Sequence, residues 1–127
     1  MAGPASHNIH IQVSTKFLQD RLPNEPDKFA FAYRVAIHNG GQHQVQLLNR
    51  YWLITDANGK KTEVRGPGVV GEQPHIPAGE TFVYTSGAVL DTPVGTMEGY
   101  YEMEDEFGVR FEAPIDVFSL AIPNVIN

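Results

Sequence analysis

The clearest candidate for a ligand-binding motif in this chain is a glycine-rich run. It matches the pattern G-x-G-x-x-G with glycines at Gly66, Gly68 and Gly71. In dinucleotide-binding proteins this pattern joins a strand to a helix, whose N-terminus meets the pyrophosphate. Here Pro74 and Pro77 follow closely, and prolines at this spacing preclude a regular helix. The backbone N–H groups of such a turn can still form an anion nest. The alternative, which we favour, is a crossing loop whose glycines permit positive φ and close backbone approach.

A second candidate is the acidic group near the end of the chain, since hard divalent cations prefer carboxylate oxygens. Glu102 and Glu104 share one face of an expected strand, but the spacing matches no EF-hand. A solvated acidic face is the alternative interpretation. We therefore expect no cofactor beyond a weakly held divalent cation, with three candidate ligands: Glu98, Glu102 and Glu104.

No catalytic arrangement emerges from the remaining reactive residue types. The five histidines form no i, i+2 or i, i+4 ligand pair, and no serine lies in a G-x-S-x-G elbow. The chain has no cysteine, which excludes disulfides, thiolate metal sites and a cysteine nucleophile. We therefore predict that the protein is not an enzyme and has no catalytic residues.

Tyrosines on the expected strands suggest a recognition surface instead. Tyr100 shares a strand face with Glu98 and Glu102, and Tyr51 lies between Arg50 and Trp52 in the sequence. Tyrosine is enriched at protein interfaces. The alternative is that these rings belong to the core and only their polar tips reach water.

The elements that must position these residues are strands almost everywhere. Apolar and polar residues alternate with a period of two, which is typical of half-buried strands. Turn residues separate the alternating segments, among them Asp56-Ala57-Asn58-Gly59 with its Asn-Gly hairpin signal. Residues 66–79 and 86–93 are expected to form loops, and Pro114 is expected to interrupt the last strand. The expected strands are 9–14, 29–38, 45–55, 60–65, 81–85, 97–104 and 109–120.

About seven short strands at this spacing predict an all-β, antiparallel β-sandwich of the immunoglobulin or fibronectin III type. Trp52 on the third strand occupies the position of the core tryptophan in such domains, and Tyr100 or Tyr101 resembles their tyrosine corner. The absent disulfide favours the fibronectin III version. A barrel remains the alternative architecture.

The length and the net charge of the chain limit the number of domains and the classes of partner that we expect. The chain has 127 residues, enough for a single domain over 1–127, with residues 1–7 expected to be disordered. The net charge of −6 argues against a nucleic-acid partner. It divides into +3 over residues 1–65 and −9 over residues 66–127, so the sign changes where the glycine run begins. With no targeting signal or apolar span, we expect a cytoplasmic protein without membrane insertion; its oligomeric state is left open.

Five segments resemble the bacterial ApaG family, and they fall in order over nearly the whole chain. The most specific is V-R-G-P-G-V-V-G-E-Q-P at positions 64–74, and the others are 49–59, 84–87, 95–101 and 118–120. The resemblance implies a fibronectin III/immunoglobulin-like sandwich of unsettled biochemical function. Family genetics imply a role in cobalt resistance and magnesium efflux, and related eukaryotic domains are taken as protein-interaction modules. The family's proposed pyrophosphate motif corresponds to Gly66, Gly68 and Gly71.

Three functions follow as hypotheses. The first is a non-enzymatic protein-interaction module with a protein partner still to be identified. The alternatives are an accessory protein in Co²⁺/Mg²⁺ resistance or efflux, and a sensor of pyrophosphate or dinucleoside polyphosphates. The candidate ligand or partner loop comprises Arg65, Gly66, Gly68, Gly71, Glu72, Gln73 and Pro74.

Overall fold

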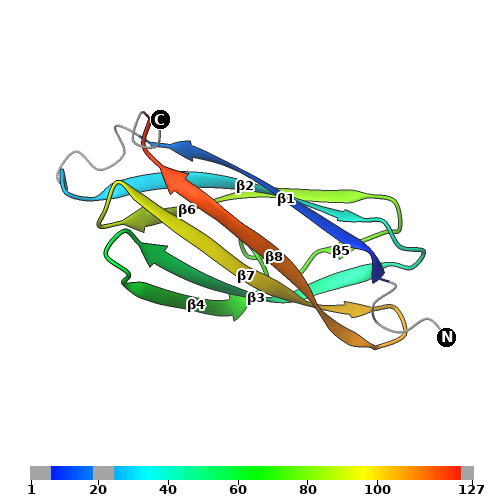
Figure 1. The fold of residues 1–127 in the computed structure, drawn as a ribbon. Coiled ribbons are helices and arrows are strands. Elements are labelled where there is room, and N and C mark those ends of the chain that lie inside the picture. The colour runs from blue at the N-terminus through cyan, green and yellow to red at the C-terminus, as the bar shows by residue number, and fades with distance from the viewer. Residues whose placement is uncertain (1–6, 19–24, 124–127) are drawn as a thin grey trace.

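The computed structural model describes residues 7–18 and 25–123, which fold into two antiparallel β-sheets packed face to face (Figure 1). The small sheet has the order β1-β2-β6, with bounds β1 Ile9–Phe17, β2 Phe29–Asn39 and β6 Thr81–Leu90. The large sheet has the order β4-β3-β7-β8, with bounds β3 Val45–Asp56, β4 Lys61–Pro67, β7 Val94–Asp105 and β8 Arg110–Ala121. A two-residue strand, β5 (His75–Ile76), pairs with the start of β3. The predicted sandwich is confirmed, and the barrel is not formed.

The period-two pattern determines which side chains enter the space between the sheets. On β2 the inward residues Phe31, Tyr33, Val35 and Ile37 are at most 6% exposed, whereas the outward Arg34 is exposed. Trp52 of β3 is 2% exposed and packs edge-on against the Tyr33 ring from the opposite sheet, at 5.4 Å between centroids. The predicted core tryptophan is therefore confirmed. No helix in the described part of the chain is long and apolar enough to cross a membrane.

Two expectations about strand boundaries were wrong. Residues 86–90 were expected in a loop but belong to β6, which pairs with β2 as far as Leu90. The small residues Ser86, Gly87 and Ala88 weaken the hydrophobic signal without breaking the alternation. The expected loop 66–79 also contains β5, because Ile76 is buried in the core at 1% exposure. Pairing across the fold therefore extends strands beyond their local signal.

Pro114 was expected to interrupt the last strand, but β8 continues through it from Arg110 to Ala121. β8 lies at the edge of the large sheet, where one side of the strand has no ladder partner. A proline at an edge can leave its missing N–H on the unpaired side. By contrast, the hairpin at Asp56 forms as predicted: Gly59 has φ +83°, and the Asp56 carboxylate accepts hydrogen bonds from the backbone N–H groups of Asn58 and Lys60.

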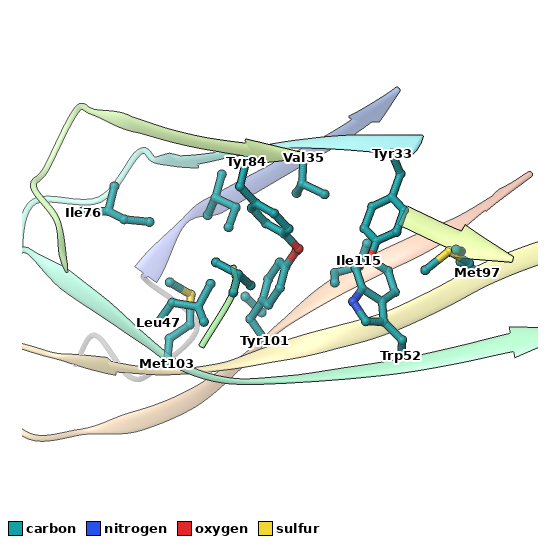
Figure 2. Packing of buried hydrophobic residues seen from close by; sticks show 14 of the residues in the cluster. Tyr33, Val35, Leu47, Trp52, Ile76, Tyr84, Met97, Tyr101, Met103 and Ile115 are labelled. Atoms are coloured by element: carbon teal, nitrogen blue, oxygen red, sulfur yellow. The ribbon is translucent and has the colours of Figure 1, made fainter. Parts of the chain in front are cut away.

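A pair of buried tyrosines joins the two sheets. Tyr84 of β6 and Tyr101 of β7 point toward each other in Figure 2, and their hydroxyl groups share a hydrogen bond. They are 6% and 0% exposed. Burial raises the pKa of both phenols, so both are protonated at neutral pH. Neither the position nor the burial of Tyr101 makes it a tyrosine corner, because its hydroxyl group bonds Tyr84 and not the backbone a few residues upstream.

We expect Tyr84→Phe and Tyr101→Phe each to lower the free energy of unfolding by about 1–2 kcal/mol, because each leaves a buried hydroxyl group without its partner. The double variant should lose no more than the worse single variant, since both polar groups are then removed. Urea unfolding of the four proteins measures this cycle. Strictly additive losses would contradict the hydrogen-bonded pair.

Candidate functional site

The glycine loop, residues 66–74, is anchored on a β-bulge in β3. The register of β3 with β7 shifts between Leu47 and Asn49, so Leu48 is the extra residue. The Leu48 carbonyl oxygen accepts hydrogen bonds from the Gly68 N–H at 2.8 Å and from Gln73 Nε2 at 2.9 Å. The bulge therefore fixes both ends of the loop to one backbone carbonyl group.

Arg50 holds the same loop from the other side. Its Nη1 donates to the carbonyl oxygens of Pro67 at 3.1 Å and Gly68 at 3.0 Å. A Cβ atom on Gly66 would lie 3.0–3.1 Å from the Arg50 guanidinium group. Gly66 thus provides the space in which this guanidinium group reaches the loop carbonyls.

The tip of the loop is a tight turn over residues 69–72. Val69 and Glu72 exchange two backbone hydrogen bonds, at 2.8 and 2.9 Å. The two central residues, Val70 and Gly71, have φ of +43° and +81°, as in a type I′ turn. Val69 is buried at 1% exposure, whereas Val70 is 55% exposed. A β-branched residue with positive φ is an outlier of the kind that concentrates at functional sites.

Most of the predicted loop residues have a structural role in forming or anchoring the loop. Gly68 has φ +63°, and a Cβ atom there would lie 2.1 Å from the Glu72 carbonyl oxygen. Gln73 is an anchor, and the Pro74 carbonyl oxygen accepts the N–H of Leu47. The arrangement matches the crossing-loop interpretation. The N–H groups of Gly68, Val69 and Glu72 already donate within the protein, and pyrophosphate binding stays a prediction.

Arg65 instead belongs to a surface cluster, the tyrosine patch, which consists of Tyr51, Arg65 and Tyr100. These residues lie side by side on the outer face of the large sheet, because Tyr51 pairs with Arg65 of β4 and with Tyr100 of β7. The two rings are 5.0 Å apart between centroids, and the Arg65 guanidinium carbon lies 4.3 Å from the Tyr51 ring centroid. The Tyr100 hydroxyl group beside Arg65 raises the pKa of the guanidinium group, which stays charged.

Neighbouring polar groups hold the patch in place. The Tyr51 hydroxyl group donates to the Glu63 carboxylate at 2.7 Å, and this hydrogen bond raises the pKa of Tyr51. Arg65 Nη2 lies 3.7 Å from the same carboxylate. On the other side, Asn49 Nδ2 donates to Glu102 at 2.5 Å. The half-buried Tyr51 ring is therefore held by Glu63 and Arg65, and the Asn49–Glu102 pair lies beside the patch.

An open hollow of about 370 Å³ lies over the patch and reaches the start of the glycine loop. It brings together Arg65 and Gly66, predicted from the loop, and Glu102, predicted from the acidic group. The other predicted loop residues do not line it. Its lining residues are Asn49, Arg50, Tyr51, Arg65, Gly66, Pro67, Tyr100 and Glu102.

The acidic candidates do not assemble into a cation cage. Arg110 Nε lies 3.4 Å from Glu104, and Arg110 Nη1 lies 4.0 Å from Glu102, so one guanidinium group serves both carboxylates. Glu98 is exposed and pairs across the sheet with Leu53. Among residues 7–18 and 25–123, no three acidic or histidine side chains come together as a metal site. The predicted role in cation resistance or efflux remains untested.

Histidines take part in structural contacts at the other end of the large sheet. His7 Nε2 lies 2.9 Å from Asp105 Oδ2, and its ring stacks on Phe111 at 3.6 Å. The hydrogen bond with His7 lowers the pKa of Asp105. His43 packs edge-on against Phe107. Residues 1–6 of the segment predicted to be disordered lie outside the described residues.

Sequence reasoning missed Asn49 and Arg50 as parts of the site. The sequence gives no clear signal there, because apolar residues stand at both odd and even positions, but in the structure the buried residues of β3 change phase, from Val45 and Leu47 to Trp52. A change of phase within one strand indicates a bulge, and a bulge re-aims the following side chains. Glu63 was not among the predicted site residues, and its hydrogen bond with Tyr51 follows from the pairing of β3 with β4.

Comparison with known proteins shows that this chain is similar to the members of one family. Residues 19–105 match the family model described as the ApaG domain. Proteins named Protein ApaG from Klebsiella pneumoniae (strain 342) and Proteus mirabilis (strain HI4320) are 52% and 53% identical to this chain over 122 residues. Each alignment covers 96% of this chain and 98% of the relative.

Solved structures show the same fold. The X-ray structure of the structural-genomics target SoR45 superposes with a TM-score of 0.90 at 44% identity, covering 96% of this chain and 92% of that chain. A Bordetella pertussis protein solved under the name ApaA gives a TM-score of 0.87 at 44% identity, covering 92% of this chain and 95% of that one.

Proposed function

The chain belongs to the ApaG family, and on that premise we propose that it acts as a protein-interaction module, not as an enzyme, and binds a partner protein through the tyrosine patch. The observation that carries the proposal is the arrangement of Tyr51, Arg65 and Tyr100 on the open face of the large sheet. Tyrosine and arginine are enriched at the energetic centres of protein interfaces.

Preorganisation supports this use of the patch. Glu63 holds the Tyr51 hydroxyl group, and Arg65 lies over the Tyr51 ring in the free protein. Side chains that are already fixed lose less conformational entropy when a partner binds, so more of the contact energy appears as affinity. The hollow beside them accepts a side chain of the partner, with Asn49 and Glu102 on its rim.

The glycine loop extends the same surface. Gly66 and Pro67 line the hollow, and the loop continues to Val70, which is apolar and 55% exposed with a strained backbone. Strain of this kind persists only where the surrounding structure holds it, and here the turn at 69–72 and the buried Val69 do so. The loop tip is therefore a second apolar contact for the same partner.

Affinity capture from a lysate of the source organism tests the proposal. Wild-type protein is compared with Tyr51→Ala/Tyr100→Ala, and a matched surface control, Gln12→Ala/Ser14→Ala, alters the outer face of the small sheet. We expect a partner that wild type and control recover equally and that the tyrosine variant loses by more than about 10-fold, since interface tyrosines each contribute about 2 kcal/mol.

Unfolding curves of all three proteins show whether each variant is folded, and only folded variants are compared in the capture experiment. If every protein recovered by the wild type is also recovered by the folded tyrosine variant, the patch is not the binding surface. Purified wild type and partner then give the dissociation constant directly, and Val70→Gly measures what the loop tip adds.

A further inference from the structure

The outer face of the small sheet differs in charge from the rest of the protein. Strands β1, β2 and β6 contain no aspartate or glutamate, and their two basic residues, Lys16 and Arg34, are both exposed. The long strands of the large sheet carry eight acidic residues and four basic ones. The two sheets pack against each other in Figure 1, so the small sheet turns this basic face away from the acidic sheet.

Arg34 lies at the centre of this basic face. It is the middle residue of β2, the central strand of the small sheet. In the part of the chain that the structure describes, its side chain forms no ion pair and no hydrogen bond, whereas Arg50, Arg65 and Arg110 each contact a carbonyl or carboxylate oxygen. The five N–H donors of the Arg34 guanidinium group are therefore available to an acceptor from outside the chain.

The acidic residues that neighbour the small sheet in the sequence all lie beyond the ends of its strands. They are Asp20, Glu25, Asp27, Glu80 and Asp91. Asp91 pairs with Lys28 and Lys60, which also lie outside the small sheet. Arg34 is about 16 Å along β2 from either end of the strand, at the usual rise per residue. Because exposed charges are screened over about 8 Å at physiological ionic strength, carboxylates at the strand ends do not neutralise Arg34.

Small side chains surround Arg34 and leave space on the basic face. Ala32 and Ala36 flank it along β2, and Ser14 pairs with it across β1. A shallow hollow of about 400 Å³ lies there, lined by Gln12, Val13, Ser14, Arg34 and Ala36. Val83 pairs with Ala36 and is 41% exposed, so it adds an apolar contact beside the hollow. The backbone of a partner can therefore approach β2 closely while one of its side chains reaches the guanidinium group.

We propose that the basic face binds an acidic segment of a partner protein, with Arg34 as the central contact. Lys16 pairs with Ala32, and Arg34 pairs with Ser14, so the two cations are diagonal neighbours about 7 Å apart at their Cβ atoms. Carboxylates two residues apart in an extended chain have the same spacing of about 7 Å. The guanidinium fork binds one carboxylate bidentately, and Lys16 meets the next. The bound segment is therefore extended, with acidic residues at alternate positions.

The number of charges favours a protein segment over a nucleic acid as the occupant. Nucleic acids are held by many phosphate contacts, whereas this face offers two cations in a chain whose net charge is −6. Two cations suffice for a short acidic segment, and the charge complementarity then sets its position on the sheet. The tyrosine patch lies on the outer face of the other sheet, so one copy of the chain has room for a partner on each side.

An NMR titration of the labelled protein with a synthetic peptide that alternates Glu and Thr tests the proposal. We expect amide shifts on β1, β2 and β6, and no binding of the matched peptide that carries Gln in place of Glu. Arg34→Glu should weaken binding by at least about 10-fold, because like charges then face each other. Lys61→Glu, which makes the same charge change at an exposed residue of β4, is the matched control and should bind within about two-fold of wild type.

Two further variants separate this face from other effects. Gln12→Ala/Ser14→Ala keeps both cations and should bind the Glu peptide within about three-fold of wild type. Tyr51→Ala/Tyr100→Ala should bind it like wild type, so the basic face and the tyrosine patch fail independently. Equal binding of the Gln peptide, equal affinities of Arg34→Glu and Lys61→Glu, or amide shifts confined to the large sheet each overturns the proposal. A duplex oligonucleotide that binds the same amides more tightly than the peptide also overturns it.

Discussion

Gly99→Ala is expected to destabilise the fold by about 4 kcal/mol or more, which is among the largest effects of a single methyl group. Gly99 of β7 pairs with Trp52 of β3, beside the register shift between β7 and β8. A Cβ atom there would lie 1.9 Å from the Tyr51 carbonyl oxygen and 3.1 Å from the Trp52 Cα. Both obstacles are backbone, so the central strands of the large sheet would have to separate.

Two other glycines in strands extend this prediction to a series of Gly→Ala variants in which the new Cβ atom is progressively less crowded. At Gly95 the nearest atom to a new Cβ is the Thr55 carbonyl oxygen at 2.7 Å, and at Gly87 it is the Phe31 carbonyl oxygen at 3.4 Å. We expect Gly95→Ala to cost about 2 kcal/mol and Gly87→Ala to stay within about 0.5 kcal/mol of wild type. Urea unfolding gives the order, with the yield of soluble protein as the measure if Gly99→Ala does not fold. An equal response at the three positions would contradict it.

Gly68→Ala is expected to lower the free energy of unfolding by about 3 kcal/mol. The new Cβ atom would collide with the Glu72 carbonyl oxygen, and alanine would have to adopt the positive φ of Gly68. Gly71→Ala is the matched control, because Gly71 has φ +81° but a Cβ there would meet no atom within 4 Å. Gly71→Ala should lower the free energy of unfolding by only about 1 kcal/mol, because alanine is strained in the left-handed conformation. The difference isolates the contact between position 68 and the Glu72 carbonyl oxygen. Chemical denaturation of the purified variants measures it.

The outcome bears on what the glycine run is for. If glycines 66, 68 and 71 serve the crossing loop, stability falls in the order that the contacts predict. A Gly68→Ala protein as stable as Gly71→Ala would mean that the loop yields easily, and the run would then need another explanation. Adding pyrophosphate to the two labelled proteins and following the loop amides by NMR tests the ligand hypothesis separately.

Much of the fold is predictable because strand patterning is local. A period of two assigns each residue of β2 to the inside or the outside, and Phe31, Tyr33 and Ile37 lie where the alternation places them. The turn at Asp56 is equally local, since the Asp56 carboxylate bonds N–H groups two and four residues away. The full length of β6 was not predictable, because Ser86 and Gly87 extend the strand only through their pairing with β2.

The candidate site is a different case, because none of its decisive contacts is local. The alternation showed that Tyr100 shares a face with two glutamates, but whether its ring meets Tyr51 depends on the register between β3 and β7. Arg65 reaches Tyr51 only because β4 pairs with β3 in one register. The same holds for Arg50, which the bulge at Leu48 re-aims at the glycine loop.

Composition, alternation and turn chemistry thus determine that this chain forms an antiparallel sandwich with Trp52 in its core, since these signals act over a few residues and need no partner. The family resemblance follows from contiguous residues in the same way. The assembly of the tyrosine patch is decided by strand order and register, which are properties of contacts between distant segments. A sequence specifies those contacts only through the packing of the whole domain, because a one-residue slip between strands would turn every side chain to the other face.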